Sequence, residues 1–470
     1  MFRSCNSGRH VLSLITGAVD DRSARGVAAA VSRLVSTGAL PAGSRLPTVR
    51  DVARELGISP TTVSEAWRSL ARAGAIQTRG RSGTFVLTPT KPRQRLRYAS
   101  LTASPAVLPH DFSTGVPDYD LLPSLADALR RIGDARLTTS YLDEPVLPGL
   151  EAVLRERWPF PPQQLTVVDG ALDALDRVTT TVVRFGDHVL VENPTFPPLL
   201  DLLESVGASV VGVPVDESGL DPAALVEALA CRPSAVFLQP RAHNPTGASM
   251  TQRRADALAR ALQPHPDVIV VEDDHAGDIA GAAPVSLGRR LPDRTVRVHS
   301  FSKSHGPDLR LAAVGGPASV VTAVADRRLL GPGWSSRLLQ AVLVDLLTDP
   351  LTVAQIEAAR KEYARRRTAL LAALARRGVT ASSTDGINLW LPVADQQLAM
   401  LHLAAHGVAV APGAPFMVTP RDGDHVRVTV GLVRDGFDEL GAILADAAGT
   451  APAGSGAGGR RARSHPRGWR

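Results

Sequence analysis

The chain has 470 residues, of which 44% are hydrophobic and 21% are charged, as in soluble globular proteins of two or three domains. Two cysteines far apart in sequence, Cys5 and Cys231, exclude a disulfide framework and a metal site, and they favour a reducing compartment. No apolar run reaches transmembrane length, and the weakly signal-like N-terminus runs directly into a cytosolic domain, so we expect a cytoplasmic protein without membrane contact.

Charge is distributed unevenly along the chain, although the net charge is only +6. Residues 1–90 hold 12 basic and 5 acidic side chains, whereas residues 111–449 carry a net charge of −10. The segments 91–110 and 450–470 add four and five basic residues and no acidic ones. A basic N-terminal unit on an acidic body favours a polyanion partner for the first part, although a solvated surface gives the same charge.

Three helices are predicted in the N-terminal unit. The apolar periodicity of residues 24–37 predicts the first, which Gly38 ends. Thr48 is a suitable N-cap for a helix over 49–56, and Ser59 is one for a helix over 60–73. Because Gly57 stops the earlier of these two helices, they form a helix-turn-helix.

A basic hairpin is predicted next. The stretch AIQTRGRSGTFVLT, residues 75–88, indicates two short strands around a tip in which Arg79 and Arg81 can meet phosphates. Together with LPTVRDVARELGIS, which precedes it, this segment makes residues 24–88 resemble the winged helix of the GntR family of bacterial regulators. The resemblance implies binding to double-stranded DNA.

The second helix of the motif is expected to enter the major groove. Its N-terminal end carries Thr61, Thr62 and Ser64, and Arg50 is expected to hold backbone phosphates. The complete set of expected DNA-binding residues is Arg50, Ser59, Thr61, Thr62, Ser64, Arg79, Arg81 and Gly83. Many relatives have Arg where this chain has Pro60, so the operator sequence does not transfer from them. A winged helix used for protein contacts is the alternative, which the basic charge disfavours.

Composition predicts the domain boundaries. We expect an N-terminal segment over 1–19, the winged helix over 20–90, a Pro-rich basic linker over 91–110, an aminotransferase-like domain over 111–448 and a disordered Arg-rich tail over 449–470. The linker and tail charges either touch DNA or are merely solvated.

Strand-like apolar runs alternate with amphipathic helices from residue 111 onward. The runs are residues 188–193, 209–215, 235–240, 267–274 and 297–302. This alternation predicts an α/β domain with a mainly parallel sheet, whose ligand site lies at the carboxyl ends of the strands.

Polar residues that suit pyridoxal 5'-phosphate (PLP) follow those strands. Lysine is scarce in this chain, and Lys303 is placed to form a Schiff base with a carbonyl. PLP also needs a partner for its ring nitrogen, a phosphate grip and a stacking surface. The candidates are Asp273 for the nitrogen, the backbone amides of Ala171 and Leu172 with Ser300, Ser302 and Arg310 for the phosphate, Phe196 for stacking, and Asn244 for the phenolic oxygen.

Residues 111–445 resemble a fold-type I, class I aminotransferase along their whole length. The matching stretches occur in the family's order and include DGALDAL, ENPTFPP, HNPTG, EDDH, SFSKSHGPDLR and VRVTVGLV. The resemblance implies that Lys303 carries the PLP Schiff base and that Arg427 holds a substrate α-carboxylate. It also implies a phosphate contact from Tyr141, which in such dimers reaches across from the neighbouring subunit.

One position departs from the family pattern. Relatives have Tyr two residues after the pyridinium aspartate, and this chain has His275. An imidazole can also donate to the phenolic oxygen, but it titrates near neutrality. A role in cofactor chemistry and a role in filling space therefore both stay open.

The winged helix and the aminotransferase-like domain together resemble the MocR-type branch of GntR regulators. The resemblance implies a homodimeric regulator that binds DNA, senses PLP or an amino compound and lacks physiological turnover. A working aminotransferase with an attached DNA-binding domain is the alternative, because a sensor and an enzyme need the same residues. A PLP-independent scaffold is the least favoured reading.

Overall fold

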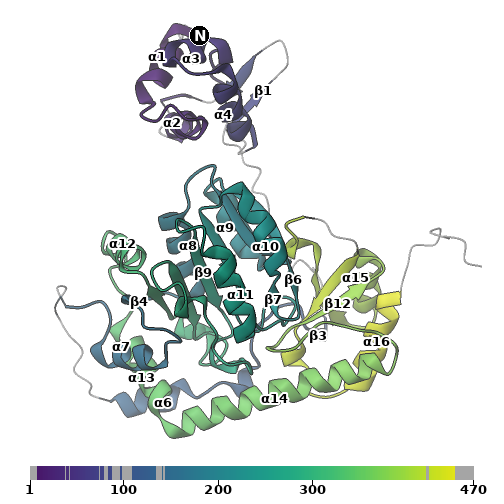
Figure 1. The fold of residues 1–470 in the computed structure, drawn as a ribbon. Helices are drawn as coiled ribbons and strands as arrows, with labels where there is room; N and C mark the ends of the chain where they lie inside the picture. Colours follow the sequence, from purple (N-terminus) through teal and green to yellow (C-terminus); the bar gives the residue numbers. More distant parts are fainter. Residues whose placement is uncertain are drawn as a thin grey trace, which may run out of the picture.

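The computed structural model describes residues 8–36, 39–41, 43–72, 75–78, 83–86, 96–97, 108–133, 140, 143–419 and 423–449. The predicted phosphate contacts Arg79, Arg81 and Tyr141 lie outside the described residues, as do most of the linker and of the C-terminal tail. Figure 1 shows a small N-terminal unit above a larger α/β body.

The described part of the N-terminal unit is a winged helix. The helices expected at 24–37, 49–56 and 60–73 are present with nearly those bounds, and the hairpin strands pair Ile76 with Val86. Thr48 caps its helix by accepting a hydrogen bond from the Asp51 amide at 3.2 Å. The elements are α1 (Gly8–Ala18), α2 (Ala24–Ser36), α3 (Val49–Leu56), α4 (Pro60–Arg72), β1 (Ile76–Thr78) and β2 (Thr84–Val86).

The first helix, α1, belongs to the winged-helix core. Val11 and Ile15 on α1 are buried together with Val31, Trp67 and Leu70 from the later helices. The winged-helix unit therefore starts earlier than the boundary at residue 20 that composition suggests. Apolar spacing over four helical turns explains the packing, because one stripe of α1 must leave water.

An eight-stranded sheet forms the centre of the body. The strand order is β4-β11-β10-β9-β8-β5-β6-β7, and the five strands from β10 to β6 pair in parallel. Buried valines dominate these strands because helices cover both faces. The strands are β4 (Gln164–Val168), β5 (His188–Asn193), β6 (Ser209–Asp216), β7 (Gly219–Leu220), β8 (Ala235–Leu238), β9 (Ile269–Asp274), β10 (Thr295–Ser300) and β11 (Ala312–Gly316).

Helices and short 3₁₀ turns surround this sheet. The helices are α6 (Leu125–Ile132), α7 (Pro148–Arg157), α8 (Ala171–Val182), α9 (Pro197–Ser205), α10 (Pro222–Ala228), α11 (Gln252–Leu262), α12 (Ala318–Leu329) and α13 (Arg337–Thr348). The 3₁₀ turns are η2 (Tyr119–Leu121), η3 (Leu229–Cys231), η4 (Gly277–Ile279), η5 (Leu287–Arg289) and η6 (Pro307–Leu309). The predicted α/β fold with a mainly parallel sheet is confirmed.

A smaller C-terminal layer follows the long helix α14 (Pro350–Ala375), which runs along the base of the body (Figure 1). It has its own core around Leu389, Val426 and Leu444. Its elements are β12 (Leu389–Val393), β13 (Val408–Ala409), β14 (Ala411–Pro412), β15 (Asp424–Val428), η7 (Ala414–Phe416), η8 (Val430–Leu432), α15 (Gln396–Ala405) and α16 (Phe437–Gly449), with β3 (His110–Asp111) pairing β13.

The described helices were compared with the length and hydropathy that a bilayer requires. No single one is long and apolar enough to span a membrane, and α13 and α14 meet the requirement only together, across a bend of 74°.

Candidate cofactor site and DNA-binding surface

Asp273 lies near the carboxyl end of β9 on one face of the sheet. It is opposite Val298 of β10, and its neighbours Glu272 and Asp274 point to the other face because side chains alternate along a strand. Gln239 donates a hydrogen bond to Oδ2 at 2.7 Å, whereas Oδ1 is buried without a hydrogen-bond partner. Burial raises the pKa of Asp273 to about 6. An acceptor held without a donor suits a ligand N–H.

Lys303 follows β10 and is half-buried at the same edge of the sheet. Its Nζ lies 2.9 Å from His275 Nδ1 and 3.5 Å from the His275 carbonyl oxygen. Burial lowers the pKa of Lys303 to about 8, with Asp273 opposing and Arg427 assisting the shift. A lysine with a lowered pKa has a larger neutral, nucleophilic fraction at neutral pH.

The position of His275 decides which of its nitrogens carries a proton. Its Nε2 lies 2.9 Å from the carbonyl oxygen of Ala242, which can only accept, so Nε2 is the donor. Burial holds the pKa of His275 well below its usual value, so the neutral ring has an unprotonated Nδ1. That Nδ1 accepts from Lys303, and His275 in this arrangement does not donate to a phenolic oxygen as Tyr would.

The turn after β4 forms an anion cradle. Gly170 has φ +97° and precedes α8, whose first amides at Ala171 and Leu172 have no partner within the helix. Arg310 donates to the Asp169 carbonyl oxygen at 2.9 Å, and a Cβ built on Gly170 would come within 3.1 Å of its guanidinium. The guanidinium and the helix N-terminus therefore meet at one point, as a phosphate grip requires.

Two serines flank the lysine loop. Ser300 ends β10 and is buried, and its Oγ accepts from the Ser302 amide at 3.3 Å. Ser302 is half-buried. The bond between them holds the start of the loop that carries Lys303.

Arg427 and Asn244 lie against each other. Arg427 on β15 is 2% exposed and its Nη1 donates to Asn244 Oδ1 at 3.3 Å, while Nη2 donates to the Ser113 carbonyl oxygen. The guanidinium also lies 5.2 Å from the ring centroid of Phe416. A buried guanidinium next to the proposed phenolic-oxygen contact is suited to a carboxylate.

Phe196 occupies the N-cap position of α9. It is half-buried and packs against the core under the central sheet. Its role as a stacking surface is neither supported nor opposed by a contact in the structure.

Sequence reasoning missed the residues that orient these groups. Gln239 aims Asp273 and also accepts from the Asn244 amide at 2.7 Å through Oε1. Arg328 pairs with Asp169 at 3.2 Å, and Ser335 donates to Asp169 Oδ1 at 2.6 Å, which holds the turn before α8. Gln239 ends a strand and was accessible to the strand-end argument, whereas the latter two come from distant helices without a local signal.

The residues present fit PLP. A buried carboxylate oxygen lacks a donor, a lysine with lowered pKa lies at the same strand ends, and a glycine leaves space beneath an arginine at a helix N-terminus. These are the partners that a pyridine nitrogen, an aldehyde and a phosphate require.

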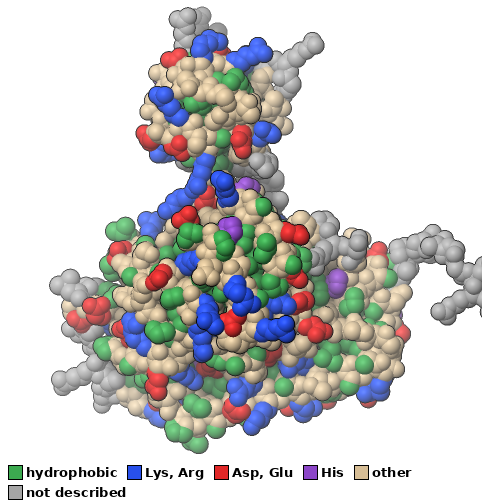
Figure 2. Space-filling model, in the orientation of Figure 1, with side chains coloured by type: hydrophobic (Ala, Val, Ile, Leu, Met, Phe, Trp, Pro, Cys, Tyr) green, Lys and Arg blue, Asp and Glu red, His purple; other side chains and the backbone are tan. Residues whose placement is uncertain are grey.

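The start of α4 is the expected DNA-reading surface. Ser59 caps the helix by accepting from the Thr62 amide at 3.1 Å, and its Oγ lies 2.9 Å from Thr62 Oγ1. Thr61 is exposed, and Thr62 and Ser64 are half-buried. Basic and acidic side chains alternate over this unit in Figure 2, so phosphate contacts depend on individual residues such as the exposed Arg50.

Gly83 begins the second wing strand, and sequence reasoning missed its neighbour Arg45. Gly83 has φ +103°, and a Cβ there would come 2.8 Å from Arg45 Nε. Arg45 forms a β-bridge with Phe85, so its exposed guanidinium lies along the wing. It is a further candidate for phosphate contact.

The winged helix contacts the body at the end of α8. Arg25 Nη2 lies 2.8 Å from Asp187 Oδ1, and Phe185 packs against the winged-helix core. One helix therefore connects the anion cradle at its N-terminus with the DNA-binding unit just beyond its C-terminus.

Comparison with known proteins supports both halves. Residues 23–86 match the model of the bacterial regulatory proteins of the gntR family, and residues 110–442 match aminotransferase class I and II. The chain is 34% identical over 434 residues to the vitamin B6 salvage pathway transcriptional repressor PtsJ of Salmonella typhimurium, which covers 91% of this chain and 98% of the relative. It is 28% identical to the pyridoxine biosynthesis transcriptional regulator PdxR of Corynebacterium glutamicum, with 72% and 75% covered.

Solved structures agree on the body. Aspartate aminotransferase from Thermus thermophilus with maleate is 25% identical, has a TM-score of 0.64 and covers 73% of this chain and 92% of its own. The α-aminoadipate aminotransferase LysN from Thermus thermophilus is 24% identical with a TM-score of 0.65, and covers 75% and 97%. Both have the same aminotransferase fold as residues 110–442.

Proposed function

The chain belongs to the MocR-type branch of the GntR family of bacterial transcriptional regulators, and on that premise we propose that it binds PLP at Lys303 and reports occupancy of that site to operator DNA. It acts in the cytoplasm as a homodimer, because two half-sites need two winged helices. PtsJ and PdxR, two relatives, are named for control of vitamin B6 metabolism, which makes a B6-related role the first to test.

The observation that carries the proposal is the buried Asp273 Oδ1 without a donor. A carboxylate kept in the fold at a raised pKa is costly unless a cationic partner arrives, and such groups cluster at functional sites. A protonated pyridine nitrogen is that partner. PLP, when bound, supplies an electrophilic carbonyl that accepts amines.

Each protein group has a defined task in this proposal. Lys303 attaches the carbonyl carbon, and His275 holds the Nζ in place by accepting its proton. Arg310, Ser300 and the first amides of α8 hold the phosphate. Arg427 beside Asn244 holds the carboxylate of an amino compound that enters as effector.

The signal reaches the winged helix along α8. Phosphate binding orders the N-terminus of this helix, and the contact of Arg25 with Asp187 lies beyond its other end. A ligand acts as a switch only if it binds one arrangement of the two units better than the other. The proposal therefore requires a difference in operator affinity between PLP-loaded and PLP-free protein.

The test compares Lys303→Ala with Lys361→Ala. Lys361 is an exposed lysine on α14 that pairs only with Glu357 on its own helix. We expect wild type and Lys361→Ala to bind PLP with a visible absorption band and to change operator affinity on loading, as seen by gel shift. Lys303→Ala should show neither effect. A colourless wild-type protein with normal operator binding would overturn the proposal and favour a PLP-independent scaffold.

Aminotransferase turnover is the second candidate. The pKa of Lys303 near 8 favours it, because a base near neutral pH is what proton transfer needs. Rapid conversion of PLP to pyridoxamine phosphate with an amino acid, followed by reversal with a keto acid, would establish it. Exchange of amines without that conversion would leave the regulator alone.

A further inference from the structure

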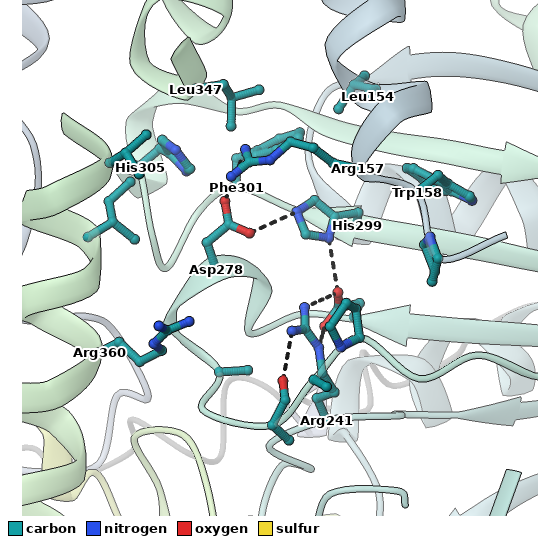
Figure 3. A pocket seen from close by; sticks show the side chains of 18 of the residues that line it. Leu154, Arg157, Trp158, Arg241, Asp278, His299, Phe301, His305, Leu347 and Arg360 are labelled. Atoms are coloured by element: carbon teal, nitrogen blue, oxygen red, sulfur yellow. Dashed lines mark hydrogen bonds and ion pairs between the residues drawn. The ribbon is translucent and has the colours of Figure 1, made fainter. Parts of the chain in front are cut away.

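A second cavity lies behind the loop that carries Lys303. It has a volume of about 410 Å³ and lies on the face of β9 and β10 opposite to Asp273. Phe301 and His305, which flank Lys303 by two residues on each side, line it, with α7 and α14 on the other sides (Figure 3). We call it the rear cavity. Its size is that of a small-molecule site.

The floor of the rear cavity is a satisfied ionic network. Asp274 Oδ2 lies 2.6 Å from both Arg241 and Arg297 and 2.9 Å from His299 Nδ1. Burial disfavours the charged form of Asp274, but the two arginines outweigh it and hold its pKa well below the usual range. These groups use their charges on one another and leave little for a ligand.

Four further charged side chains line the walls, two of each sign. Arg157 Nη1 and Asp278 Oδ2 are 3.6 Å apart, which is too long for a hydrogen bond. Arg360 and Glu357 pair with each other on α14. All four side chains are partly exposed, so they can reorient toward a bound molecule. Loosely paired charges of both signs match a ligand that itself carries both.

His305 offers a fifth polar group. It is 1% exposed, its Nε2 has no hydrogen-bond partner, and Figure 3 shows its ring at the cavity wall. Its Nδ1 lies 2.8 Å from Ser304 Oγ, whose own proton is directed to the Phe301 carbonyl oxygen. Nδ1 is then the donor, and burial lowers the pKa of His305 to about 4, so the ring is neutral with an acceptor at Nε2. An ammonium group satisfies such an acceptor.

The rest of the wall is apolar. The side chains that form it are Leu154, Trp158, Phe301, Leu346, Leu347, Val353 and Ile356. An apolar surface of this kind accommodates an aliphatic or aromatic side chain.

We propose that the rear cavity is a second effector site, which binds a free amino acid with an apolar side chain. Arg157 and Arg360 receive its carboxylate, Asp278 and His305 receive its ammonium group, and Trp158 and Phe301 contact its side chain. The site is non-covalent and does not rest on PLP binding. Its occupant contacts the two residues that bracket Lys303, so it touches the cofactor loop from behind.

The probe is L-phenylalanine, titrated by calorimetry into full-length protein treated with borohydride. Reduction fixes PLP on Lys303 by adding hydride to the C=N carbon and a proton to nitrogen, so the amine of the probe has no carbonyl to attack. Visible absorption before reduction reports PLP binding separately. If the protein carries no PLP, the proposed function fails, and the same titration on untreated protein still tests the rear cavity.

Two variants and a matched control locate the site. Arg157→Gln removes one wall charge, and Val353→Trp fills the cavity from an exposed position on α14. Arg155→Gln is the control, because Arg155 lies on the same helix with similar exposure and pairs with Glu151 away from the cavity. We expect single-site binding to wild type and Arg155→Gln, and a dissociation constant raised at least about tenfold in both other variants.

Two analogues test the charge pattern. Phenethylamine lacks the carboxylate and 3-phenylpropionate lacks the ammonium group, and each should bind at least about tenfold more weakly than L-phenylalanine. Equal binding of either analogue would overturn the zwitterion assignment. Absence of binding to wild type, or binding that Arg157→Gln and Val353→Trp leave unchanged, would overturn the site itself.

Discussion

Asp273→Asn tests whether the buried carboxylate serves a ligand at the expense of the fold. Asp273 is 4% exposed, and burial raises its pKa to about 6 against an ordinary value of 3.8. A group with a raised folded-state pKa stabilises the fold only while it is protonated. That contribution is present below the unfolded-state pKa and is lost as pH rises through about 6. The asparagine keeps the hydrogen bond from Gln239 and cannot ionise.

The magnitude follows from the shift of roughly two pH units, which corresponds to about 3 kcal/mol. In cofactor-free protein the variant should exceed wild type in free energy of unfolding by about 3 kcal/mol at pH 7.5. The same expression leaves an advantage of about 1.5 kcal/mol at pH 5, where part of the wild-type carboxylate is protonated. PLP affinity should fall at least about tenfold, because a charge-assisted hydrogen bond is lost.

Urea unfolding of the two cofactor-free proteins at both pH values measures the difference, and absorption titration measures PLP affinity. Asp256→Asn is the control, since Arg290 lowers the pKa of that surface carboxylate and no gain in stability with pH is expected. An Asp273→Asn protein that is less stable than wild type at pH 7.5 would refute the reasoning. An advantage that does not grow between pH 5 and pH 7.5 would refute it equally.

Three other changes test the remaining parts of the proposal. Gly170→Val places a side chain against Arg310 in a backbone with φ +97°, and it should weaken PLP at least about tenfold by absorption titration, unlike Gly378→Val, whose φ of +74° lies in open space. Arg50→Gln should flatten the slope of log affinity against log salt by about 0.9 in operator-binding titrations; an unchanged slope would remove Arg50 from the phosphate contacts. Arg25→Gln should leave PLP binding intact and abolish its effect on operator affinity in gel shifts, and a preserved effect would exclude α8 as the route.

The local chemistry of the chain was sufficient for much of the architecture. Capping residues and glycines predicted the bounds of α3 and α4, because a helix end is decided within a few residues. Valine-rich runs predicted the parallel strands, since strands covered on both faces must be apolar throughout. Strand ends in turn predicted that Asp273 and Lys303 meet at one edge of the sheet.

Only the tertiary structure decided what those groups contact. The proton position on His275 depends on the carbonyl oxygen of Ala242, which lies 33 residues away along the chain. The start of the winged helix at α1 depends on packing with α2 and α4, and the contact of Arg25 with Asp187 joins two domains. The rear cavity combines charges from α7, α14 and the loop after β9. Such long-range contacts leave no periodicity or spacing in the sequence, because each residue is chosen by neighbours that folding alone brings near.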